Sequence, residues 1–209
     1  MQRKPLLIGA AVCAVSCAQP TPPDPQYTAQ WLRSSLSFVR SERLGPPVAS
    51  RISAYGALAL YEGYASEPTS GLRSLGGQLN GLTSLPQAPA GGVDGATVAA
   101  EAMRVVLDSL FRDGFASTRR AIETLAAAQV EGRRAAGVGK DMSDRSAAHG
   151  RSLGAAILAW AATDGFFDTR RRAWTAPKTR EQWENTVTQD QFVPLMLSGE
   201  SDLVAPTNP

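Results

Sequence analysis

The sequence predicts an all-α protein, a helical bundle of about five main helices followed by a poorly regular C-terminal tail. Two observations lead to this class. Apolar residues recur at spacings of three and four along most of the chain, which is the period of an amphipathic helix. No stretch shows the alternation of apolar and polar residues that a half-buried strand requires. With 209 residues, 43% of them apolar and 19% charged, the chain is long enough to bury a core of ordinary size.

The amino terminus is typical of a targeting segment. Arg3 and Lys4 precede an apolar run over 6–16, which is too short to span a bilayer but suits a secretory signal. Removal of this segment takes both basic residues with it, so the formal charge falls from +2 to about zero. A neutral mature chain argues against a nucleic-acid partner.

Two cleavage sites are compatible with this segment. Residues 1–17 form a lipoprotein signal if Ala14-Val15-Ser16-Cys17 acts as a lipobox, in which case Cys17 carries the lipid. Ordinary cleavage after Ala18 is the alternative. We favour lipidation, because Cys17 stands where the apolar run ends. We therefore expect an exported protein, lipid-anchored in the cell envelope, or periplasmic or secreted if Cys17 is not lipidated. Residues 18–26 are rich in proline and are expected to form an extended tether that holds the domain off the membrane.

The helical domain is expected over 27–165. Its first helix ends before Gly45-Pro46-Pro47, and its second runs over about 47–65, since proline is preset for a first turn. One apolar stripe is predicted on the first helix, formed by Tyr27, Trp31, Leu32, Leu36 and Val39. On the second helix, three tyrosines are interpreted as core or rim aromatics whose hydroxyl reaches a partner: Tyr55, Tyr61 and Tyr64.

Three further helices follow a segment over 66–95 that is rich in Gly, Ser and Pro and is expected to hold one short helix near 70–79. Asp94 is the predicted N-cap of the third helix, and Ser117 that of the fourth, after a break at Gly114. The fifth helix is expected over about 143–163. Its residues His149, Leu153, Ala156 and Trp160 share one face, and Gly150 and Gly154 lie on an adjacent face where another helix can approach closely. The tail over 166–209 is expected to be irregular, with one weak helix around 180–187.

Candidate chemical groups each have a structural interpretation that we prefer. His149 is the single histidine, and its place on an apolar stripe favours a hydrogen-bonded core or interface residue over catalysis. Asp164 and Asp168 could act as paired carboxylates in acid–base chemistry. A structural interpretation is simpler: Gly165 caps the end of the fifth helix, and Asp168 pairs with the arginines that follow it. The arginines at 170–172 could bind an oxyanion, although neutralisation by Asp164, Asp168 and Glu181 is preferred.

Several classes of site are excluded by composition and motif. Cys13 leaves with the signal and Cys17 lies at the extreme end, so we expect no disulfide, thiolate metal site or cysteine nucleophile. No Gly-x-Ser-x-Gly elbow is present to serve a serine triad. The glycine pairs Gly76-Gly77 and Gly91-Gly92 lack the strand-then-helix setting of a phosphate loop. We therefore expect no catalytic, cofactor-binding or metal-binding residues.

Two stretches, taken together, resemble a known family. Trp31 to Ala65, especially the run Arg43-Leu44-Gly45-Pro46-Pro47-Val48-Ala49-Ser50-Arg51 and then Ala59 to Gly63, resembles the opening helices of bacterial secreted vanadium-dependent haloperoxidases. Ala148 to Gly154, leading to Trp160 to Gly165, is similar to the helix that this family places before its catalytic half. The family belongs with the type 2 phosphatidic acid phosphatases. The resemblance covers roughly residues 30–205 and implies vanadate as the cofactor of a complete family protein.

The motifs that bind the oxyanion in that family do not occur in this chain. There is no Arg-Pro pair and no Pro-Ser-Gly-His, and Ser50-Arg51 is the only Ser-Arg pair. Vanadate needs several cationic donors, one imidazole that binds the metal and another group that moves protons. His149, as the single histidine, cannot fill both of the last two positions. Our first hypothesis is the amino-terminal helical half of such an enzyme, inactive alone, whose partner is a missing C-terminal half or a second copy. The alternative is a stand-alone lipoprotein that binds or scaffolds in the cell envelope.

Overall fold

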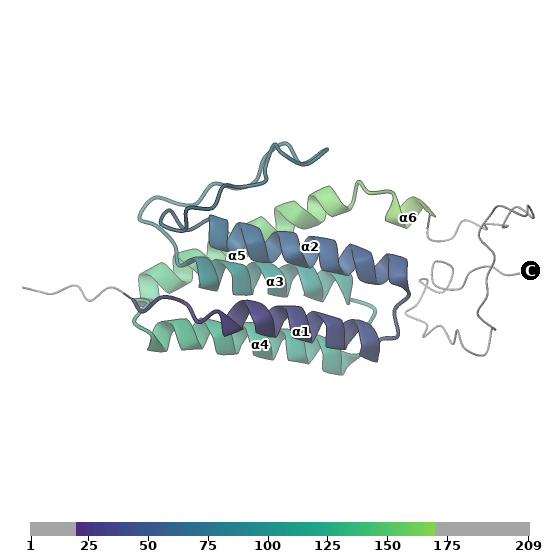
Figure 1. The fold of residues 1–209 in the computed structure, drawn as a ribbon, viewed down its shortest axis with the longest axis horizontal. Coiled ribbons are helices and arrows are strands. Elements are labelled where there is room, and N and C mark those ends of the chain that lie inside the picture. Colours follow the sequence, from purple (N-terminus) through teal and green to yellow (C-terminus); the bar gives the residue numbers. More distant parts are fainter. Residues whose placement is uncertain (1–19, 170–209) are drawn as a thin grey trace, which may run out of the picture.

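The computed structural model describes residues 20–169, which form six α-helices and no strand. The expected all-α class and five-helix bundle are confirmed. Figure 1 shows five long helices lying side by side, with a short sixth helix at one end of the bundle. The helices are α1 (Gln26–Ser41), α2 (Pro46–Ala65), α3 (Gly95–Leu110), α4 (Ala116–Ala135), α5 (Lys140–Ala161) and α6 (Phe166–Thr169).

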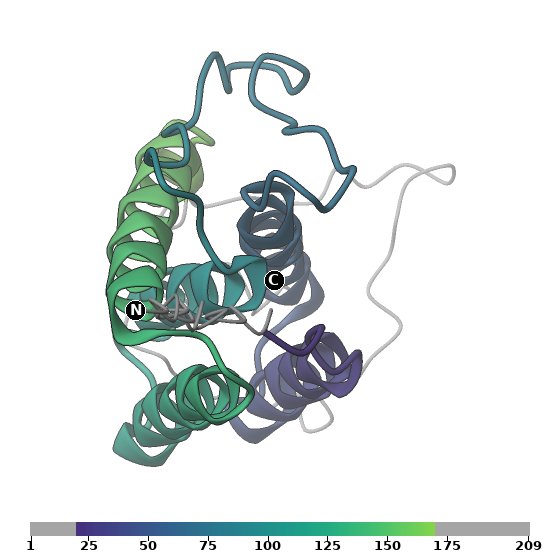
Figure 2. The same cartoon turned by 90° about the vertical axis from the view of Figure 1, so that its left-hand side faces the viewer.

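Helix α3 is the centre of the bundle. Seen end-on, it is surrounded by α1, α2, α4 and α5 (Figure 2), and its closest packing is with α5, α2 and α4. Its apolar side chains are buried around most of the helix, including Val98, Ala99, Ala102, Met103, Val106 and Leu107. A helix that is apolar on nearly all sides is stable in water only if neighbours cover it. The sequence of α3 therefore requires the other helices around it.

The close approach that we predicted at two glycines is confirmed. A Cβ atom at Gly150 would lie 2.5 Å from the carbonyl oxygen of Val98, and one at Gly154 would lie 2.8 Å from Cβ of Val105. Both contacts are with α3. The two glycines therefore let α5 approach α3 more closely than a residue with a side chain would allow.

The predicted stripe on α1 is only partly correct. Trp31 is fully buried and Phe38 nearly so, but Leu32 and Leu36 are 48% and 53% exposed. Trp31 and Phe38 lie seven residues apart, or about two turns, and so share the face that meets the bundle. Leu32 and Leu36 share a different face, which points away from it. Spacing alone could not decide which of the two faces is buried.

The short helix expected near 70–79 is absent. The segment forms turns, with one isolated bridge between Leu79 and Leu82. Gly71 and Gly77 have φ values of 68° and 77°, which a right-handed helix cannot contain. The connection is nevertheless held on the bundle, since the backbone N–H of Leu75 donates to the buried carboxylate of Glu62.

One predicted cap is confirmed and another is wrong. The Asp94 carboxylate accepts a hydrogen bond of 2.9 Å from the backbone N–H of Thr97, as expected of an N-cap. Ser117 does not cap α4, which begins at Ala116. The N-cap residue is Phe115, and the carboxylate of Glu42, at the end of α1, accepts from the N–H of Phe115 and from the hydroxyl of Thr118. A contact that comes from another helix leaves no local sequence signal.

The amino-terminal connection does not extend away from the bundle over the residues described. The N–H of Thr21 donates to the carbonyl of Ala136 at 3.1 Å, and Arg133 donates to the carbonyl of Thr21 at 2.7 Å. Arg133 also forms a buried ion pair with Asp94 at 2.7 Å. This part of the predicted tether, 20–25, is thus fastened to the end of α4. Cys17 and the signal lie outside the described residues.

The remaining boundaries agree with the sequence to within a few residues. The second and fifth helices were expected over 47–65 and 143–163, and they run over Pro46–Ala65 and Lys140–Ala161. The tail begins with the short helix α6 instead of irregular chain. The predicted weak helix at 180–187 lies outside the described residues. Within 20–169, no helix has the length and apolarity that a bilayer crossing requires.

Candidate functional site

A cavity of about 600 Å³ opens where the start of α2 meets the end of α5 and α6. This volume is within the range of small-molecule sites. Its walls are mostly apolar and aromatic, and three of its residues carry groups that meet each other: Arg51, Tyr55 and Asp164. The other lining residues are Pro47, Ser50, Ala54, Leu58, Leu79, Trp160, Phe166 and Thr169.

The Asp164 carboxylate is the centre of the polar cluster. Its Oδ2 accepts from Nε of Arg51 at 2.7 Å and from the hydroxyl of Tyr55 at 2.9 Å. Its Oδ1 accepts from the backbone N–H of Phe166 at 2.9 Å, at the first turn of α6. Arg51 also donates from Nη2 to the carbonyl of Ala161 at 3.2 Å. The cluster therefore ties α2 to the C-terminal end of α5 and to the start of α6.

Aromatic rings surround the guanidinium of Arg51. Its central carbon lies 4.4 Å from the ring centre of Phe166 and 5.1 Å from that of Tyr55, within the range of cation–π contacts. Tyr55 meets Trp160 edge to face, with ring centres 5.4 Å apart. Trp160 donates from its indole nitrogen to the carbonyl of Asn80 at 3.2 Å. The connection over 66–94 is thereby joined to the same end of the bundle.

The protonation states of this cluster are set by burial and hydrogen bonds. Burial raises the pKa of Tyr55 to about 12, with a further contribution from its hydrogen bond to Asp164. Partial burial alone would raise the pKa of Asp164, but hydrogen bonds from Phe166, Arg51 and Tyr55 outweigh it and lower that pKa. At neutral pH the phenol is protonated and the carboxylate is ionised. Both groups are far from the pKa that proton transfer near pH 7 requires.

His149 lies elsewhere in the fold, as a buried residue of α5. It is 6% exposed, and its Nε2 lies 3.1 Å from the hydroxyl of Ser66. Burial lowers the pKa of its imidazole, which is consequently neutral at pH 7. It does not line the cavity. The structure thus places His149 as the hydrogen-bonded core residue that we preferred on sequence grounds.

The other predicted groups do not assemble into a second site. Asp168 is exposed on α6, and the arginines at 170–172 and Glu181 lie outside the described residues. Gly165 does not cap α5, whose C-cap is Ala162. It follows Asp164 with a φ of 78° and turns the chain into α6. Across the described part of the chain, no group of three or more His, Cys, Asp or Glu could hold a metal ion.

Sequence reasoning missed the role of Arg51. The chain pairs it with Asp164, 113 positions later, so no local pattern reveals the contact. A weaker signal was present, because Arg51 and Tyr55 lie four residues apart on one helix and therefore share a face. The interpretation of Tyr55 as an aromatic whose hydroxyl reaches a partner agrees with its bond to Asp164.

Comparison with known proteins gives a partial match to a solved structure. No family model matches the sequence, and neither does any curated protein. The fold and sequence are similar to the first bacterial vanadium-dependent iodoperoxidase, with a TM-score of 0.60 and 26% identity. The match covers 74% of this chain but only 36% of the iodoperoxidase chain. The helical bundle is therefore similar to a part of a haloperoxidase, and the match spans well under half of that protein.

The described residues do not fit vanadate, the group that this similarity suggests. The His149 imidazole is directed to Ser66 and does not line the cavity. The cavity holds one arginine, Arg51, whose charge is already neutralised by Asp164. An oxyanion there would meet a carboxylate at close range. We therefore derive no reaction step through vanadate in this bundle.

Proposed function

We propose that this chain is the amino-terminal helical region of an exported, vanadium-dependent haloperoxidase-like protein and is not catalytic by itself. The observation that carries the proposal is the partial match, which covers most of this chain but about a third of the iodoperoxidase. The absence of a Pro-Ser-Gly-His element from the sequence agrees with it. In a complete protein, vanadate would bind to residues supplied by the catalytic half.

The role of the bundle in this proposal is structural support. The Arg51–Asp164 cluster holds α6 and the end of α5 against α2. In this proposal it fixes the point from which the chain leaves the bundle toward the catalytic half. Such a role needs fixed geometry and no proton transfer, which is consistent with an ionised Asp164 and a protonated Tyr55.

A stand-alone lipoprotein, binding or scaffolding in the cell envelope, is the second candidate. One observation favours it. The core closes within the residues described, around fully buried side chains from all five long helices: Trp31, Ile52, Met103, Leu107, Ile122, Leu153 and Ile157. A bundle with such a core has the burial that independent folding requires. In both proposals the chain is exported, and Cys17 is the site of lipidation.

The coding sequence beyond Pro209 separates the two candidates. An in-frame or adjacent segment that encodes Pro-Ser-Gly-His supports the haloperoxidase-like protein. A stop codon there, together with a folded monomer in solution, supports the stand-alone lipoprotein. Mass spectrometry of the cellular protein tests lipidation, which predicts a diacylglyceryl-modified Cys17 at the new amino terminus.

Catalytic inactivity has its own assay. The purified chain is mixed with vanadate, hydrogen peroxide and iodide or bromide, and halide oxidation is followed. We expect no rate above that of vanadate without protein. A vanadate-dependent rate of halide oxidation that rises in proportion to the concentration of the protein would overturn the claim that this bundle is inactive alone.

A further inference from the structure

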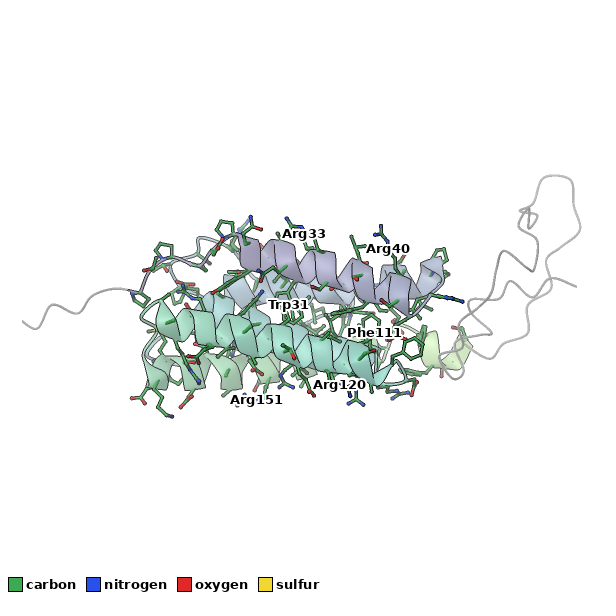
Figure 3. All side chains as sticks on the ribbon, turned by 90° about the horizontal axis from the view of Figure 1, so that it is seen from below. Trp31, Arg33, Arg40, Phe111, Arg120 and Arg151 are labelled. Atoms are coloured by element: carbon green, nitrogen blue, oxygen red, sulfur yellow. The ribbon has the colours of Figure 1, made fainter. Side chains whose placement is uncertain are left out.

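The outward face of α1 combines apolar and basic side chains. At about 100° per residue, Leu32 and Leu36 lie about 40° apart around the helix, and Arg40 and Arg33 lie within about 100° of Leu32. All four are exposed, and the two leucines are 48% and 53% exposed. Figure 3 shows Arg33 and Arg40 projecting from the outer edge of α1, while Trp31 points toward α4. We call these four residues the α1 outer face.

Helices α1 and α2 themselves carry no exposed carboxylate. Between Gln26 and Ala65 the only acidic residues are Glu42 and Glu62, which are 0% and 3% exposed. Glu42 accepts from the N–H of Phe115 and Glu62 from the N–H of Leu75, so both are directed inward. Arg33, Arg40 and Arg43 are exposed and have no ion pair in the described part of the chain. The first two helices therefore present positive charge without compensation.

We propose that the α1 outer face docks on the surface of an anionic lipid bilayer. Leucine side chains on such a face insert at the boundary of the acyl chains, and arginine stems extend their guanidinium groups to lipid phosphates. Each basic residue near an anionic membrane contributes attraction that decays with ionic strength. The charge complementarity favours this partner over a protein surface, which would need a matching acidic and apolar patch.

The place of attachment agrees with this docking. Thr21 is held at the end of the bundle where α1 begins, by Ala136 and Arg133. Cys17 is four positions earlier, and at about 3.5 Å per residue it lies within about 14 Å of Thr21. A lipid on Cys17 would hold this end of α1 near the membrane. The α1 outer face would supply a second contact. This proposal draws on the proposed export of the chain and is independent of its relationship to haloperoxidases.

Vesicle binding tests the proposal without the lipid anchor. The full chain with Cys17→Ser is sedimented with vesicles of phosphatidylcholine, or of phosphatidylcholine and phosphatidylglycerol in equal amounts. We expect stronger binding to the anionic vesicles and a decrease as salt is added. The amino-terminal apolar run is the same in every variant, so differences between variants report on α1. Equal binding to both kinds of vesicle would overturn the proposal.

Matched variants assign the binding to α1. The double variant R33Q/R40Q should bind anionic vesicles more weakly, by about fivefold for each arginine removed. L32S/L36S should weaken binding to the same vesicles as well. R120Q is the control, because Arg120 is an exposed arginine on α4, at the opposite edge of the view in Figure 3. A loss in R120Q equal to that in R33Q/R40Q would show only a general charge effect and contradict the proposal.

Size-exclusion chromatography of the same proteins distinguishes other occupants of the face. Self-association that L32S/L36S abolishes, without vesicle binding, would assign the α1 outer face to a second copy of the chain. Selective binding of a separately expressed catalytic half, lost in the same variant, would assign it to that half. Either result would overturn membrane docking. Circular dichroism should be the same in all variants, since every side chain altered on α1 and α4 is exposed.

Discussion

Arg51 on α2 and Asp164 beyond α5 are joined by a hydrogen-bonded ion pair of 2.7 Å between Nε and Oδ2. The two side chains are 14% and 24% exposed, so water screens the pair only in part. Tyr55 and the N–H of Phe166 donate to the same carboxylate. This one carboxylate therefore connects three segments of the chain.

Replacing Arg51 with methionine should destabilise the bundle. Arg51→Met keeps much of the length of the side chain but removes the charge-assisted hydrogen bond, which contributes about 1.5–3 kcal/mol in partly buried settings. The free energy of unfolding in urea should fall by about that amount. The pKa of Asp164 should rise, because one of the groups that lower it is lost. The double-mutant cycle repeats Arg51→Met in a chain that already carries Asp164→Asn. If Arg51→Met lowers the free energy of unfolding equally in both chains, the two residues are not coupled, which would contradict a direct interaction.

The exposed pair of Arg119 and Asp108 serves as the control. Its Nε–Oδ1 distance is 2.9 Å, but its side chains are 44% and 33% exposed. Solvent-screened pairs of this kind contribute little to stability. Arg119→Met should therefore leave the urea midpoint unchanged.

Adding a methyl group at Gly150 should force α5 away from α3. The new Cβ would meet the carbonyl oxygen of Val98 and the backbone nitrogen of Ala102, at 2.5 and 3.2 Å. Backbone atoms cannot move aside as side chains do, so Gly150→Ala should destabilise the fold by about 1–3 kcal/mol. Thermal unfolding followed by circular dichroism measures the change.

Gly56 provides the matched control for this substitution. It also lies inside a helix, but a Cβ there would make ordinary contacts of 3.7 Å with the flexible side chains of Leu107 and Met103. Alanine is the better helix former, so Gly56→Ala should be neutral or stabilising by about 0.5–1 kcal/mol. If both variants lose equal stability, steric contact with α3 is not the cause at Gly150.

The sequence predicted the long helices well because each carries its own local signals. Pro46 and Pro47 mark the start of α2, and Asp94 caps α3 with its own side chain. The spacing of Gly150 and Gly154 predicts that another helix approaches α5 closely, but it does not identify that helix as α3. The α1 stripe was less accurate, because Leu32 and Leu36 have the same spacing as core residues and still face outward. Only the position of the neighbouring helices distinguishes the two faces.

The candidate site was much less predictable than the fold. Its main contact joins Arg51 to a carboxylate that follows α5, and the start of α4 is held by Glu42 from the end of α1. Such pairings depend on how helices are placed in space, which periodicity does not encode. His149 was predictable as a core residue because its apolar neighbours on α5 are spaced as one face of a helix.

Removal of Arg133 should destabilise the fold more than removal of Arg51. Arg133 and Asp94 are each 4% exposed and form a bidentate pair with distances of 2.7 to 3.2 Å. Arg133→Met would leave a buried carboxylate without its counter-charge, which typically costs about 3–5 kcal/mol. Unfolding in guanidinium chloride measures this loss. Hydrogen exchange at the amide of Thr21 should also become faster, because Arg133 holds that segment through its carbonyl.

A different result would reassign the role of the pair. If Arg133→Met unfolds at the same denaturant concentration as the unaltered chain, Asp94 must be adequately stabilised by Thr97 alone. Because a destabilised variant can fail to accumulate, Arg133→Lys is the second measurement. It keeps the charge but not the fork geometry, and should lose less stability than the methionine variant.

Because of the His149 imidazole, the free energy of unfolding should decrease as the pH falls below the ordinary pKa of histidine. Burial lowers its pKa below the usual value of 6.5, so the unfolded chain binds a proton more readily than the folded one. The corresponding stability is fully present above pH 6.5 and is lost as the pH falls toward the folded-state pKa. In His149→Gln, the decrease in the free energy of unfolding between about pH 7 and 5 should therefore become shallower.

Proton NMR measures the pKa of the same imidazole directly, because His149 is the single histidine of the chain and gives one set of ring resonances. Ser66→Ala removes the hydrogen bond at 3.1 Å but leaves the burial. Since burial is the cause of the lowered pKa, the histidine of this variant should still titrate below 6.5. A pKa at or above 6.5 in the unaltered chain would mean that the imidazole is solvated, and would contradict its place in the core.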